Sequence, residues 1–167
     1  MAGSHYQSQG DGSNFQCLPD DPEYSNKSIQ APSSSLRPVQ YSQVPNLYRH
    51  RVPCVACETK QRLTLIMIPA KIRCPSSDWN LEYRGYLMSE LEHDSYKPDD
   101  FSHASYRGPR SFVCVDENAE SFGSIPDTWA GGVLHTVGAS CTGSGAVLNC
   151  PPYKSDNSAL SCVVCSK

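Results

Sequence analysis

The chain has 167 residues, a formal net charge of −3 and a hydrophobic fraction of 38%. This length allows one domain or two small ones, and the nearly balanced charge provides no basic stripe for nucleic acid and no basic amphipathic helix for a membrane. The longest apolar run, residues 63–69, is far too short to span a bilayer. We therefore expect neither nucleic-acid binding nor membrane insertion.

Cysteine is unusually frequent. Nine cysteines accompany 13 prolines and 11 glycines. A small apolar core usually needs cross-links, and this combination is typical of disulfide-stapled, loop-rich domains in oxidising compartments. We therefore expect a secreted, extracellular protein. Asn26-Lys27-Ser28 is a glycosylation sequon at Asn26, which agrees with secretion.

The first third of the chain has little periodicity. Residues 1–16 are predicted to form a tail or a loop. Residues 19–46 are proline-rich and are predicted to form a long irregular loop packed by Tyr24, Tyr41 and Tyr48, because helices and central strands tolerate proline poorly.

Strands are predicted in the remaining two thirds. Residues 63–68 form the clearest one, and their lack of alternation indicates burial on both faces. Residues 81–88 alternate and form a second strand. Shorter strands are predicted at residues 111–115, 133–137 and 161–164, with polar loops at 97–109 and 117–132 and one helical turn at 89–93. The expected fold is mainly β, loop-rich and poor in helix.

The cysteines fall into two similar sets. Cys54-Val55-Ala56-Cys57 and Cys162-Val163-Val164-Cys165 are CxxC pairs in similar contexts, and each is preceded by a lone cysteine, Cys17 or Cys114, in another similar context. Two elements in the same order indicate an internal duplication. A duplicated disulfide framework should contain an even number of cysteines, and nine is odd.

The CxxC pairs are open to three interpretations. Four thiolates at this spacing can bind one zinc ion, but these two pairs lie far apart and have no knuckle residues between their cysteines. A redox CxxC usually precedes a helix in a βαβ setting, which is absent. Structural disulfides are the favoured interpretation, because cysteines three residues apart in a strand point to opposite faces and can reach two different partners.

Seven short motifs stand out together along the chain. Three of these motifs are Leu18-Pro19-Asp20-Asp21-Pro22-Glu23 after Cys17, Cys74-Pro75-Ser76-Ser77-Asp78-Trp79, and Gly85-Tyr86-Leu87-Met88. The other four are Ile66-Met67-Ile68-Pro69-Ala70, Phe112-Val113-Cys114-Val115-Asp116, Cys150-Pro151-Pro152-Tyr153, and Cys162 to Lys167. Together these motifs resemble the carboxy-terminal noncollagenous domain of collagen IV, and more closely the short-chain collagen C4-like, spongin-type group. The resemblance runs from about Ala2 to Lys167.

The resemblance implies two tandem disulfide-stapled, β-rich repeats of the collagen IV noncollagenous type, at residues 1–70 and 71–167. It also implies four disulfides: Cys17–Cys54, Cys74–Cys165, Cys114–Cys162 and Cys141–Cys150. Cys57 is then unpaired, or paired outside this chain. In the family, the cysteine that bonds to its counterpart lies upstream of the position at which this chain begins. We expect N-terminal truncation or an alternative start. The chain has no Gly-x-y run, so any collagenous portion lies outside it.

By resemblance, the expected function is that of a non-enzymatic extracellular-matrix module that self-associates or joins related matrix chains, through residues 66–68 and 86–88. The alternative is a soluble secreted protein that uses the same scaffold to recognise glycans or surfaces, with Trp79, Trp129 and the tyrosines as candidate stacking residues. We favour these aromatics as core residues.

No catalytic or metal-binding pattern stands out. The histidines lie in polar stretches without ligand spacing, the acidic residues 90–100 lack EF-hand spacing, and no nucleophile elbow or phosphate loop occurs. We expect no cofactor and no enzyme activity. The histidines are His5, His50, His93, His103 and His135.

Overall fold

The computed structural model describes residues 1–3, 14–25, 36–44, 46–58, 64–90, 111–123, 131–141, 148–154 and 158–167. Within these ranges the protein contains strands, turns and four disulfides, and no helix. The prediction of a mainly β, disulfide-rich fold is therefore confirmed. Asn26, the loop at 97–109 and most of the predicted turn at 89–93 lie outside the described residues. The strands are β1 (Ala2–Gly3), β2 (Arg37–Tyr41), β3 (Leu65–Pro69), β4 (Asn80–Ser89), β5 (Val113–Asp116), β6 (Gly132–Thr136) and β7 (Ser161–Ser166).

The chain forms two compact units that are interleaved in sequence. The first unit comprises Met1–Ala56, Glu90–Ser111 and Glu120–Leu134. The second comprises Cys57–Ser89, Phe112–Ala119 and His135–Lys167. The two predicted repeats, 1–70 and 71–167, are defined by sequence similarity and do not coincide with these units, so the repeat boundary stays a prediction.

The first unit is built around β2. This strand pairs antiparallel with β1 and parallel with Gly132–Leu134 of β6. Val39, Val133 and Leu134 are buried, and the buried Tyr41 donates a hydrogen bond from its hydroxyl to the Glu120 carbonyl oxygen at 3.1 Å. Because strand pairing satisfies backbone groups that a buried loop would leave unpaired, this segment can enter the core.

The prediction of an irregular loop at β2 is wrong. The strand carries Pro38 near its start, and its parallel partner lies in β6, far along the chain. Its pairings with β1 and β6, both distant in sequence, make the segment a strand despite its weak local pattern. Packing by three tyrosines is also wrong, since Tyr24 and Tyr48 are exposed and Tyr41 alone is buried.

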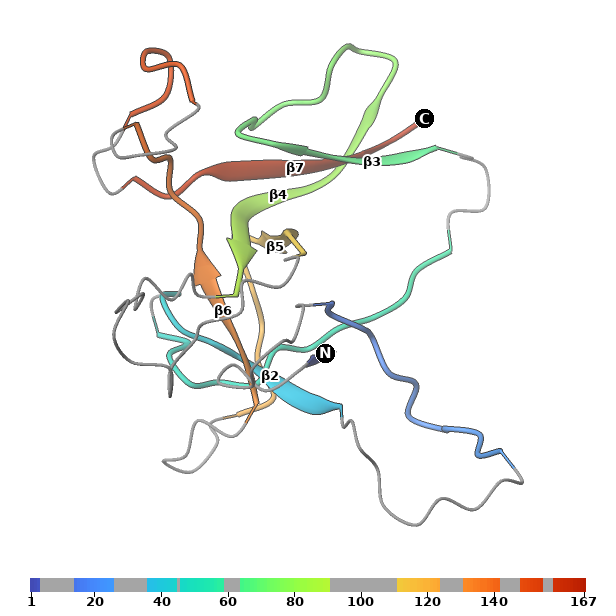
Figure 1. The fold of residues 1–167 in the computed structure, drawn as a ribbon. Coiled ribbons are helices and arrows are strands. Elements are labelled where there is room, and N and C mark those ends of the chain that lie inside the picture. Colours follow the sequence, from blue (N-terminus) through green and yellow to red (C-terminus); the bar gives the residue numbers. More distant parts are fainter. Residues whose placement is uncertain are drawn as a thin grey trace, which may run out of the picture. The chain divides into compact units, whose positions relative to one another are not determined.

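The second unit is organised around β7, which lies between β3 and β4 and is antiparallel to both (Figure 1). Cys162–Ser166 are all buried. β5 pairs antiparallel with β4 over Gly85–Met88, and His135 and Thr136 of β6 pair with the end of β4. Gly85 permits the close approach of β5, because a Cβ atom there would overlap the carbonyl oxygen of Val115.

β3 is where the burial prediction fails. This strand was expected to be buried on both faces, but Leu65 is 61% exposed and Met67 is 38% exposed, while Ile66 and Ile68 are half-buried. The reason is its position: among the described strands, β3 pairs with β7 alone and forms the edge. An apolar run does not distinguish an edge strand from a central one.

No helix in the described part of the chain is long and apolar enough to cross a membrane.

Candidate functional site

Two disulfides fix β7 from opposite faces. Cys162 bonds Cys114 of β5, with Cα atoms 5.7 Å apart, and Cys165 bonds Cys74, with Cα atoms 6.0 Å apart. The two cysteines are three residues apart on a strand, so their side chains leave opposite faces. Both are fully buried. The expectation that a CxxC strand is fixed twice therefore holds for β7.

The other cysteines form shorter connections. Cys141 bonds Cys150, and in the first unit Cys17 bonds Cys54. The four disulfides join the same cysteines as those implied by the resemblance to C4-like domains. Cys54 lies outside any strand, so the first CxxC pair does not repeat the β7 arrangement. Cys57 is exposed and is the free cysteine of the chain.

The backbone of β3 presents polar groups at the edge of the sheet. Thr64 and Lys167 exchange two hydrogen bonds, at 3.2 and 3.0 Å between nitrogen and oxygen, and the Ala70 amide donates to the Ser161 carbonyl at 2.8 Å. In an antiparallel pair, alternate residues point their backbone groups toward the partner. The amides of Ile66 and Ile68 therefore face β7, and those of Leu65 and Met67 face outward.

The side chains of the same residues are apolar. Leu65, Met67 and Pro69 alternate along β3, so they share one face of the strand, and all three are exposed. We call this feature the β3 edge: the outward backbone groups of Leu65 and Met67 with the exposed side chains of Leu65, Met67 and Pro69. An exposed apolar edge strand is a template for pairing with another strand.

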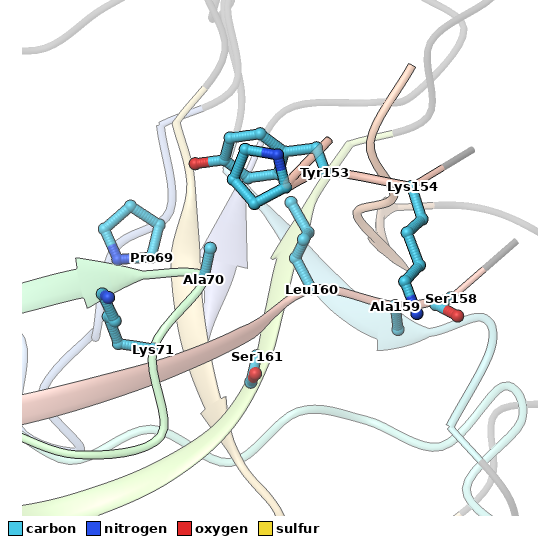
Figure 2. A pocket seen from close by; sticks show the side chains of 10 residues that line it. Pro69, Ala70, Lys71, Tyr153, Lys154, Ser158, Ala159, Leu160 and Ser161 are labelled. Carbon is cyan, nitrogen blue, oxygen red and sulfur yellow. The ribbon is translucent and has the colours of Figure 1, made fainter. Parts of the chain in front are cut away.

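An open pocket lies at the end of the β3–β7 pair (Figure 2). It has a volume of about 380 Å³. We call it the Tyr153 pocket. Its lining residues are Pro69, Ala70, Lys71, Pro152, Tyr153, Lys154, Ser158, Ala159, Leu160 and Ser161.

Electrostatic features of the second unit lie on β4 and β6. Arg84 and Glu117 form an exposed ion pair, with 2.9 Å between Nε and Oε1. Burial, with a smaller effect from the charge of Asp116, raises the pKa of Tyr83, whose hydroxyl donates to the Cys114 carbonyl oxygen at 3.1 Å. Burial lowers the pKa of His135, and its Nδ1 atom is buried without a hydrogen-bond partner.

Metal ligands do not converge in the described ranges. No group of three or more histidine, cysteine, aspartate or glutamate residues there lies close enough together to hold an ion. Cys54, Cys162 and Cys165 are in disulfides, so they carry no thiolate for zinc. His50 contacts the Ser121 hydroxyl through Nδ1 at 3.3 Å. His5, His93 and His103 lie outside the described residues.

The aromatic residues are divided between core and surface. Tyr41 is buried, Trp79, Tyr83 and Tyr153 are half-buried, and Trp129 lies outside the described residues. The sequence alone predicted no role for Lys71, Tyr153 or Lys154. Tyr153 was visible as part of the Cys-Pro-Pro-Tyr motif, but nothing in that motif indicated a pocket.

Comparison with known proteins adds no identification: no protein-family model matches the chain, and neither a curated protein nor a solved structure matches it.

Proposed function

We propose that the protein is a secreted structural module of the extracellular matrix that self-associates, with two tandem repeats of the noncollagenous type, as its resemblance to collagen C4-like domains implies. The observation that carries this proposal is the β3 edge. Its two outward amides lie along the same strand as a row of exposed apolar side chains. A second strand paired with this edge would accept hydrogen bonds from the amides and would also cover the apolar side chains.

The disulfide framework supports secretion and a structural role. Two cross-links on opposite faces hold β7, and β7 in turn pairs with the whole of β3. The edge strand is therefore supported by the most strongly cross-linked strand of the unit. A rigid edge loses little conformational entropy when another strand pairs with it, which favours assembly.

The two segments singled out by sequence differ in their suitability. In residues 66–68, Met67 is exposed and lies at the edge. In residues 86–88, Leu87 and Met88 are buried and pair with β5, and Tyr86 is exposed. The proposal therefore places self-association on β3, with strand pairing as its mechanism.

Amide hydrogen exchange tests this mechanism within one strand. The Leu65 and Met67 amides should exchange fast in dilute protein and more slowly as its concentration rises through the micromolar range. The Ile66 and Ile68 amides bond to β7 and serve as internal controls that are protected at every concentration. Exchange at Leu65 and Met67 that does not change with concentration would contradict pairing through this edge.

Glycan recognition is a second candidate function, which the Tyr153 pocket favours. The pocket combines a half-buried aromatic ring with hydroxyl and ammonium groups, and such combinations of apolar and polar groups bind small ligands. A glycan array tests this candidate, because binding of a defined sugar class by the monomeric protein would favour recognition over assembly.

A further inference from the structure

We infer that the Tyr153 pocket binds an acidic saccharide, a sugar that carries a carboxylate or a sulfate group. The inference rests on the second candidate function and specifies its site and ligand. It depends on three features of the pocket: a strand wall held by backbone hydrogen bonds, an apolar surface with an aromatic ring, and two lysines with no acidic residue among the described lining.

The strand wall of the pocket is held by backbone hydrogen bonds. The Leu160 amide donates to the Val137 carbonyl at 2.7 Å, and the Leu87 amide donates to the Leu160 carbonyl at 2.9 Å. The Ala70 amide donates to the Ser161 carbonyl at 2.8 Å, which joins the two walls contributed by the ends of β3 and β7. These bonds fix Leu160 in the lining before any ligand arrives, so binding requires little ordering of this wall.

The surface between the walls suits the face of a sugar ring. Figure 2 shows the Tyr153 ring and the Leu160 side chain between Pro69 and Ala70 on one side and Ser158 and Ala159 on the other. Pyranose rings present C–H groups on their faces and hydroxyls at their edges. An aromatic ring with an aliphatic side chain can cover such a face, while the Tyr153 hydroxyl is available for the edge.

The charge of the lining specifies the kind of sugar. Lys71 lies beside Ala70, Lys154 lies on the opposite side of the pocket, and none of the described lining residues is acidic (Figure 2). The ion pairs formed among described residues join Arg84 to Glu117 and Lys167 to Asp78, so neither pocket lysine has an acidic partner there. Two ammonium groups that have no ion-pair partner in the described part of the chain lie across one opening and favour an anion, although the chain as a whole is acidic at −3.

Three tetrasaccharide probes test the inference on the disulfide-intact protein by calorimetry: chondroitin sulfate, unsulfated chondroitin, and neutral tetra-N-acetylchitotetraose. The first carries sulfate and carboxylate, the second carboxylate only, and the third no charge. We expect binding of at least one acidic probe, weakened by added salt, and much weaker binding of the neutral one. A difference between the two acidic probes identifies which acidic group is recognised.

The variant Lys71→Gln/Lys154→Gln should weaken acidic-probe binding roughly tenfold, since exposed charge pairs contribute modestly. Tyr153→Leu should weaken all sugar binding. Lys167→Gln is the matched control: it removes one exposed lysine at the other end of β7 and should leave binding unchanged. Thermal unfolding and sedimentation of the double lysine variant should match those of the wild type. Lys71 and Lys154 are exposed, and neither belongs to β3, so the change should affect neither the core nor the β3 edge.

Acidic-probe binding that the double variant leaves unchanged would overturn the pocket assignment while leaving glycan recognition in place. Binding of the neutral probe as tight as the acidic ones would overturn the charge argument. Binding of no probe at millimolar concentration would overturn both the inference and the second candidate function. None of these results affects the self-association proposal, which is measured by sedimentation without sugar.

Discussion

Cys57 differs from the other eight cysteines in having no partner within the chain. It lies three residues after Cys54, which is bonded to Cys17, and its side chain is exposed. Exposed thiols react with alkylating agents, whereas disulfide sulfurs do not. A free thiol at Cys57 is therefore one consequence of the disulfide assignment, and the four pairs need their own measurement, because the other eight cysteines could exchange partners without changing which one is free.

We predict that alkylation of the unreduced, denatured protein adds one label, at Cys57. Peptide mapping by mass spectrometry without reduction measures this and gives the four cross-linked pairs directly. Cys57→Ser should take up no label and should unfold within about 0.5 kcal/mol of the wild type, since it alters an exposed side chain. A label at any other cysteine would contradict the assignment.

His135 should make stability depend on pH. Burial lowers its pKa in the folded protein, while the unfolded chain keeps the ordinary value near 6.5. The unfolded state then binds the proton more readily, so this contribution to stability is complete above about pH 6.5 and is lost as the pH falls through the lower folded pKa. The buried Nδ1 atom has no hydrogen-bond partner, so no such bond offsets the cost of burying the protonated ring.

We predict that His135→Phe removes this loss. Urea unfolding at pH 7.5 and pH 5 should show a smaller decrease in the free energy of unfolding for the variant than for the wild type. The variant keeps a ring at a half-buried position, so its fold should persist. An identical decrease in both proteins would show that His135 is not the titrating group.

At the scale of elements, the disulfides should differ in their contribution to stability. The bonded cysteines are 91 residues apart in Cys74–Cys165, 48 in Cys114–Cys162 and 9 in Cys141–Cys150. The loop-closure entropy removed from the unfolded chain grows with this separation. It amounts to about 4–5 kcal/mol for the two long loops and about 2.5 kcal/mol for the short one.

We predict that Cys141→Ala/Cys150→Ala still folds cooperatively, while Cys114→Ala/Cys162→Ala loses more stability. Denaturant unfolding in a Cys57→Ser background measures both, since that background prevents thiol exchange. Cys162 is fully buried, so its loss also removes packing around β7. A short-loop variant as unstable as the long-loop variant would contradict this ranking.

The elements also show what a sequence can and cannot predict. The apolar cysteine-containing strand at 161–164 and the alternating strand at 81–88 are predictable, because their patterns are local. β2 is not, because its pairing with β6 joins distant residues, and the exposure of β3 is not, because periodicity does not reveal an edge. The resemblance pointed to residues 66–68 for association, but it did not show which backbone groups of β3 face outward, and the Tyr153 pocket was not predicted, because both depend on the distant pairing of β3 with β7.

At the scale of the whole molecule, different parts of the second unit have different tasks. β7 provides the cross-linked support, the β3 edge provides the proposed surface for a second chain, and the Tyr153 pocket provides a separate proposed ligand site. The proposed self-association depends on the β3 edge, because the exposed apolar row and the outward amides belong to the same strand.

Sedimentation equilibrium of the disulfide-intact protein, alkylated at Cys57, measures this self-association. Met67→Pro removes one outward amide that β7 does not use, so it should block edge pairing, while Met67→Leu keeps that amide and serves as the control. We predict that the wild type and Met67→Leu form defined oligomers at micromolar concentration and that Met67→Pro sediments as a monomer. A wild-type protein that remains monomeric under these conditions would contradict self-association through the β3 edge.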